Sequence, residues 1–131
     1  MKLQTGTRLG LYAVLELARD PARTLSASDL AERFGVSPHH LAKVLRALAS
    51  AGLVRGGRGA AGGYRFIGNR RRVTLMDIVA LFEPAPGRRG REPGDDTDIG
   101  RSLQRVLDEI DEIAEATLRS ISLETMLKPR Q

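Results

Sequence analysis

The chain has 131 residues, of which 41% are hydrophobic and only 4% aromatic, and it contains neither tryptophan nor cysteine. This length suits one compact domain with one additional element and is too short for two full domains. Without cysteine the chain can form no disulfide, no thiolate zinc site and no thiolate-ligated iron–sulfur cluster. Because the apolar residues are mainly leucine, isoleucine, valine and alanine, we expect a mainly α-helical fold.

The charges are unevenly distributed along the sequence. Residues 1–91 contain 16 lysines and arginines against 6 acidic residues, whereas residues 92–131 contain 5 against 10. The basic first part is therefore a candidate for binding a polyanion such as DNA. No apolar run of about 18 residues and no cleavable leader is recognisable, so the sequence predicts a cytoplasmic protein.

The first predicted helix covers residues 9–19. Its apolar residues recur at helical spacing, and Asp20 before Pro21 ends it, because the residue that precedes proline disfavours helical geometry. A second, short helix is predicted to begin after Ser28 as N-cap and to end at Gly35. Gly35 and the residue after it form the predicted turn.

The third predicted helix follows directly, from Pro38 to about residue 51. Ser37 can cap its free amides, Pro38 lacks the amide that would be unsatisfied there, and Gly52 provides a stop. With about 100° per residue, the core-facing side consists of Leu41, Val44, Leu45 and Leu48. The opposite, polar and basic side consists of His39, Lys43, Arg46 and Ser50.

A hairpin and a fourth helix are predicted next. Two short β-like runs, 53–55 and 64–67, flank a glycine-rich segment, which is typical of a hairpin with a thin tip. After a run of three arginines, Thr74 is placed to cap a helix with a buried apolar stripe, and Pro84 ends that helix.

The last part of the sequence is predicted to be a linker followed by a long helix. Residues 84–98 contain prolines and glycines but no large apolar group, so we expect a flexible loop. Beyond them, apolar residues recur at coiled-coil steps with a second apolar row alongside. We expect one row to pack on the chain's own first part and the other on a partner subunit, with a short final helix after Ser122. The row assigned to dimerisation is Ile99, Leu103, Val106, Ile110, Ile113 and Thr117.

These elements together follow the winged helix-turn-helix plan, a mainly α fold with a small β-hairpin and here a long C-terminal dimerisation helix. The predicted domains are a DNA-binding domain at 1–83, the loop at 84–98, and the dimerisation helix with the short C-terminal helix at 99–131. In this plan the third helix enters the major groove of DNA, and Arg58 at the hairpin tip reaches the minor groove. The predicted DNA contacts are Ser37, His39, His40, Lys43, Arg46, Arg55, Arg58, Arg65, Lys2 and Arg8.

Several segments resemble the Rrf2 family of bacterial winged-helix transcriptional regulators. The resemblance covers nearly the whole chain and is carried by the opening Met-Lys-Leu, by LAERFGVS at 30–37, by VTLMDIV at 73–79 and, most specifically, by the hairpin motif RGAAGGY at 58–64. It implies a dimer joined through the long C-terminal helices, a recognition helix at 38–51, and Arg58 entering the minor groove.

The sequence departs from the family pattern in one loop and at one position of the recognition helix. Cluster-binding members carry three cysteines in the loop before the dimerisation helix, whereas residues 88–100 contain none, so we expect no iron–sulfur cofactor. Ala42 stands in the recognition helix where cluster-sensing members often have glutamate. The operator sequence of those members is therefore not carried over to this chain.

The predicted function is a sequence-specific transcriptional regulator, a repressor, that binds double-stranded DNA as a homodimer at a pseudo-palindromic operator. The alternative is a protein-interaction module of the same fold that has lost DNA readout. Adjacent His39 and His40 point about 100° apart on a helix and cannot chelate one metal ion, and no residue constellation predicts an enzyme. The acids at 92–98 either bind a divalent cation or solvate the loop, and a small-molecule or protein effector stays open.

Overall fold

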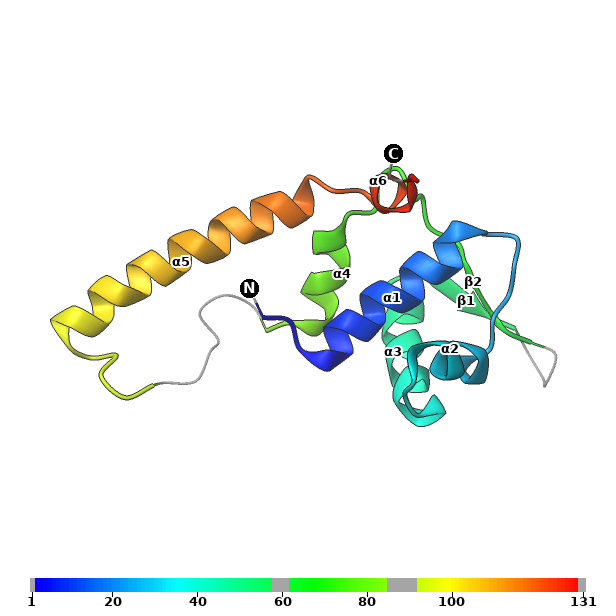
Figure 1. The fold of residues 1–131 in the computed structure, drawn as a ribbon, viewed down its shortest axis with the longest axis horizontal. Coiled ribbons are helices and arrows are strands. Elements are labelled where there is room, and N and C mark those ends of the chain that lie inside the picture. Colours follow the sequence, from blue (N-terminus) through cyan, green and yellow to red (C-terminus); the bar gives the residue numbers. More distant parts are fainter. Residues whose placement is uncertain (1, 58–61, 85–91, 130–131) are drawn as a thin grey trace.

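The computed structural model describes residues 2–57, 62–84 and 92–129, and its helices and strands are arranged as Figure 1 shows. The predicted fold class, mainly helical with one antiparallel hairpin, is confirmed. No helix among the described residues is long and apolar enough to cross a membrane. In chain order the elements are α1 (Thr5–Arg19), α2 (Ala27–Phe34), α3 (Pro38–Ser50), β1 (Val54–Gly56), β2 (Tyr64–Phe66), α4 (Leu75–Phe82), α5 (Asp98–Arg119) and α6 (Leu123–Leu127).

Helix α1 lies at the centre of the winged-helix unit, which comprises α1–α4, the hairpin and α6 (Figure 1). It packs on α3, α4, α6 and β2. Leu17 of α1, Leu45 of α3 and Ile78 of α4 are completely buried in one continuous core. Leu123 of α6 is completely buried in the same core, so α6 packs together with α1 in one unit.

The start of α2 differs from the sequence prediction: its N-cap is Ser26, and Ser28 lies inside the helix. The Ser26 hydroxyl accepts a hydrogen bond from the Asp29 amide (3.0 Å), and the Asp29 carboxylate accepts one from the Ser26 amide (2.9 Å). These two bonds form a capping box, which requires an acid three residues after the cap. The Ser26 amide, which donates to the Asp29 carboxylate, and then the Ser26 side chain hold the pKa of the exposed Asp29 carboxyl below its usual range.

The turn between α2 and α3 depends on Gly35. Its φ of 70° lies in the left-handed region, which costs a residue with a Cβ atom conformational energy. Its amide donates to the Ala31 carbonyl and closes α2. Three residues later α3 begins with its predicted cap, because the Ser37 hydroxyl accepts from the His40 amide at 3.1 Å.

The hairpin, or wing, is held by an additional bridge that the sequence did not indicate. Strands β1 and β2 pair with Val54 opposite Phe66 and Arg55 opposite Arg65. Leu25, in the loop before α2, exchanges two backbone hydrogen bonds with Tyr64, at 3.0 and 2.7 Å. A Cβ atom on Gly63 would lie 2.9 Å from the Leu25 backbone, so glycine is needed there for this close approach. The tip at residues 58–61 lies outside the described residues.

Helix α5 is long and extends away from the winged-helix unit (Figure 1). The helix begins at Asp98, one residue before its predicted beginning. Thr97 caps this start, because its hydroxyl accepts a hydrogen bond from the Gly100 amide. Its other end is fixed, because the Leu75 amide donates to the Ile121 carbonyl and the Leu123 amide donates to the Val73 carbonyl, both at 2.9 Å. Of the predicted loop at 84–98, residues 85–91 lie outside the described part of the chain.

Candidate nucleic-acid interface

The predicted recognition helix α3 has one face in the core and one face in solvent. Leu41, Val44, Leu45 and Leu48 are all buried, as predicted from their spacing. His39, Lys43 and Arg46 are exposed on the other face, while His40 is half-buried beside the Ser37 cap. The helix contains no acidic residue, so its exposed face carries only neutral and basic groups. A helix of this shape and charge can enter the major groove of DNA.

The beginning of α1 extends this basic surface beside the helix-turn-helix. Tyr12 packs against Phe34 at the end of α2, with ring centroids 5.6 Å apart. Arg8 is exposed one helical turn earlier on the same side of α1, and Lys2 is exposed just before the helix. In Figure 1 the start of α1 and α3 lie at the lower side of the winged-helix unit, and the strands of the wing lie at its right-hand end.

A long-range contact that sequence reasoning missed holds the start of α1 in place. Gln4 at the N-cap makes no side-chain capping bond. Glu83, at the end of α4, accepts from the Gln4 amide (3.3 Å) and from the completely buried Thr7 hydroxyl. A carboxylate at a helix N-terminus also interacts favourably with the helix dipole. Because its partners lie 76 and 79 residues away, no local pattern could have indicated Glu83.

The wing contributes Arg55 and Arg65, which lie directly opposite each other on the two strands. Both are exposed, on the side of the hairpin opposite to buried Val54 and Phe66. Arg58, predicted to reach the minor groove, lies outside the described residues. The structure therefore places Ser37 at the start of α3 and the base of the wing just after the end of α3, and it leaves the position of Arg58 undescribed.

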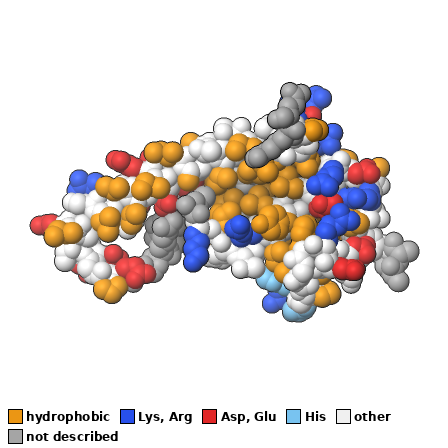
Figure 2. Space-filling view, viewed as in Figure 1, with side chains coloured by type: hydrophobic (Ala, Val, Ile, Leu, Met, Phe, Trp, Pro, Cys, Tyr) orange, Lys and Arg blue, Asp and Glu red, His pale blue; other side chains and the backbone are white. Residues whose placement is uncertain are grey.

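Within the part of the chain that the structure describes, the basic residues of this surface have no acidic partner, unlike several other arginines. Among the described residues, none of Lys43, Arg46, Arg55, Arg65, Lys2 and Arg8 forms an ion pair. By contrast, Arg19, Arg23 and Arg33 converge on the buried carboxylate of Glu16. In Figure 2 blue side chains gather around red ones at the right of this view of the molecule. Unpaired cations in solvent are available to neutralise phosphates.

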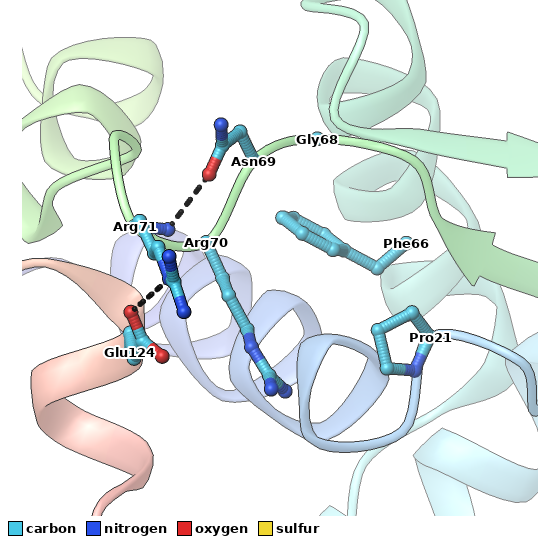
Figure 3. Close-up of a pocket in the computed structure, with 7 residues that line it drawn as sticks. All are labelled: Pro21, Phe66, Gly68, Asn69, Arg70, Arg71 and Glu124. Atoms are coloured by element: carbon cyan, nitrogen blue, oxygen red, sulfur yellow. Dashed lines mark hydrogen bonds and ion pairs between the residues drawn. The ribbon is translucent and has the colours of Figure 1, made fainter.

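A second group of basic residues is already satisfied within the protein. A shallow hollow of about 440 Å³ is lined by residues of the loop before α4 and by Glu124 of α6 (Figure 3). There Arg71 pairs with Glu124 at 3.1 Å, and Arg70 donates to the Ala18 carbonyl at the end of α1 (3.1 Å). The basic residues at this hollow therefore connect the loop before α4 to α6 and to α1, and their charges are used inside the protein.

The predicted dimerisation row is exposed along α5. No residue of this helix is buried, and Ile99 and Ile113 are 84% and 68% exposed. Leu103, Val106 and Ile110 are also exposed, as is Thr117. In the second row, Leu118 and Ile121 pack against the core, whereas Leu107 is exposed. The prediction that one row packs on the chain's own unit therefore holds only at the end of α5.

The donor groups of the chain do not fit an iron–sulfur cluster. Such clusters are held by cysteine thiolates, and the sequence has none. Among the described residues, no three histidine or acidic side chains come together as a metal site. In the acidic turn before α5, Asp95 accepts from the Glu92 amide (2.7 Å) and Asp98 pairs with Arg101, so these carboxylates are used in local structure.

The sequence and the fold match known transcriptional regulators. Residues 3–129 match the Rrf2 family, described as an iron-dependent transcriptional regulator. A relative in Rhodopseudomonas palustris named as the HTH-type transcriptional regulator BadM is 53% identical over 128 residues, which cover 98% of this chain and 82% of the relative. The oxidized form of CymR from Staphylococcus aureus has the same fold, with a TM-score of 0.82 at 23% identity over 100% of this chain and 99% of that one. IscR of T. potens gives a TM-score of 0.75 at 29% identity, over 97% and 86%. The chain therefore belongs to the Rrf2 family of transcriptional regulators, and not to a family of enzymes.

Proposed function

We propose that this protein is a sequence-specific repressor that binds a pseudo-palindromic operator as a homodimer. The observation that carries the proposal is the exposed face of α3, which presents Lys43 and Arg46 without an ion pair to any described residue. The helix is capped by Ser37. In the major groove, lysine and arginine on such a face reach base edges or phosphates. A dimer that occupies its operator acts most simply by blocking access to the promoter.

Dimerisation is proposed from the state of α5. A monomer with this helix would expose a continuous row of large apolar side chains, including Ile99, Val106 and Ile110. Contiguous apolar surface of this kind marks an interaction site in a soluble protein. A second copy is the proposed occupant, because two identical rows at coiled-coil spacing can cover each other about a two-fold axis.

The two-fold axis determines what the operator must look like. Each protomer would place one α3 in a major groove, so the half-site centres should lie about 34 Å apart or at a multiple of that distance. We further propose that the protein acts without a cysteine-ligated cluster, since its sequence offers no thiolate. DNA binding is then not controlled through such a cofactor.

Selection of binding sites from random duplexes tests this proposal. We expect enrichment of one inverted repeat, and we expect affinity for it to fall roughly a thousandfold or more between 50 and 200 mM salt as counterions are released. Absence of an enriched site even at low salt would contradict the proposal and favour the alternative of a protein-interaction module.

A further inference from the structure

The base of the wing holds two like charges at close range. In the antiparallel register Arg55 is directly opposite Arg65, and residues opposite each other have their Cβ atoms only about 5 Å apart. Both side chains lie on the exposed side of the hairpin, and neither has an acidic partner among the described residues. Like charges in this position destabilise a hairpin. The pair therefore has no evident structural benefit in the free protein.

The surroundings of this pair provide room for an anion. A hollow of about 160 Å³ is lined by Arg55, Arg65, Thr24 and four glycines of the wing, and no acid takes part. The bridge between Leu25 and Tyr64 places Thr24 beside Arg65, so Thr24, Arg65 and Arg55 follow one another across three adjacent segments. Two arginines and one threonine, residues whose side chains can all donate hydrogen bonds, thus line one space.

The arginines around Glu16 differ from this pair, because a carboxylate of the protein itself lies between them. There, three arginines surround the buried carboxylate of Glu16, which offsets their repulsion. At the wing the corresponding anion is not supplied by any described residue. The difference indicates that the anion comes from a binding partner.

We propose that Arg55 and Arg65 form a single clamp for one phosphodiester of the DNA backbone. This inference rests on the proposed function, and it specifies that the two arginines share one phosphate instead of contacting two. Because β1 follows α3 after only three residues, the clamp lies near the C-terminal end of the recognition helix. A phosphate contact there sets the register in which Lys43 and Arg46 meet the bases.

Methylphosphonate substitution of the selected operator, one phosphate at a time, tests the clamp. We expect Arg55→Gln and Arg65→Gln each to weaken binding roughly tenfold per half-site, the size of one charge-assisted contact. In each half-site, a methylphosphonate at one position should weaken binding of the unaltered protein. On DNA that carries this methylphosphonate, neither Arg55→Gln nor Arg65→Gln should weaken binding further. Arg119→Gln, on an exposed arginine at the end of α5, serves as the matched control and should leave affinity unchanged.

The stability of the free variants provides a second readout. Removal of either like charge should leave the thermal midpoint equal or higher, so that lost affinity cannot be attributed to unfolding. The clamp would be overturned if the two variants became insensitive at two different phosphates, or if neither variant changed affinity for an operator that the unaltered protein binds. Failure of the unaltered protein to bind any duplex would instead contradict the proposed function itself.

Discussion

Helices α3 and α5 are both amphipathic, but they differ in where their apolar faces find a partner. The 13 residues of α3 include four that are buried in the chain's own core, whereas the 22 residues of α5 include none. Only the end of α5 reaches the core, through Leu118 and Ile121. An apolar stripe therefore shows that a helix needs a partner, but it does not show which chain provides that partner.

Truncation of a core leucine should give the largest effect. Leu45→Ala, at a completely buried position of α3, should lower the free energy of unfolding by about 2–5 kcal/mol at every protein concentration, because it leaves a cavity. Ile113→Ala on α5 should lower the free energy of unfolding by an amount that depends on protein concentration, because this side chain is assigned to the contact with a second copy. Denaturant titrations at two concentrations a hundredfold apart measure both. A concentration-independent loss for Ile113→Ala would contradict the assignment of this row to a second copy.

A charge introduced into the exposed row of α5 should prevent dimerisation. Ile110→Glu would bury a carboxylate between two apolar faces, and we expect the dissociation constant to rise at least roughly a hundredfold, because an unpaired buried charge costs several kcal/mol. Ala116→Glu adds the same charge to an exposed position outside this row and should leave the dimer intact. Sedimentation equilibrium distinguishes the two results, and equal behaviour of both variants would contradict the proposed interface.

The contact between Glu83 and the start of α1 should have a moderate effect. Glu83→Ala leaves the Gln4 amide and the buried Thr7 hydroxyl without their acceptor, which should lower the free energy of unfolding by about 1–3 kcal/mol. Hydrogen exchange should accelerate first in the opening turn of α1, and unchanged protection of residues 5–8 would show that the contact does not hold this turn.

The smallest effect is expected at the cap of α2 and depends on pH. The pKa of Asp29 is lowered in the folded state, so its contribution to stability is complete above the unfolded-state pKa of about 3.9 and is lost as the pH falls through the lower folded value. Asp29→Ala should therefore be less stable than the unaltered protein at neutral pH. The difference should decrease below about pH 4, as measured by thermal unfolding across pH 2–7, and a constant difference would contradict this linkage.

Local chemistry predicted much of the fold and part of the interface. The Ser37-Pro38 start of α3, its buried leucines and the Thr74 cap of α4 depend on residues within one or two helical turns, and all were predicted from the sequence. The N-cap of α2 was placed at Ser28 because that serine directly precedes an acid. The capping box instead requires the acid three positions after the cap, which selects Ser26.

Other features could not be predicted because they depend on packing between distant segments. The bridge from Leu25 to Tyr64 and the contact from Glu83 to Thr7 form only once α1, α4 and the wing are assembled. The sequence indicated that Arg55 and Arg65 are basic residues of a hairpin. Only the strand register shows that they face each other.

The affinity of the selected operator for Lys43→Ala and Arg46→Ala variants is the most direct test of the account. Both side chains are exposed on α3 and make no ion pair with a described residue, so neither change should affect folding or dimerisation. Fluorescence anisotropy should show at least tenfold weaker binding for each variant, with loss of base preference at the contacted positions. Unchanged affinity and preference for both variants, in protein that remains folded and dimeric, would contradict the assignment of α3 as the recognition helix.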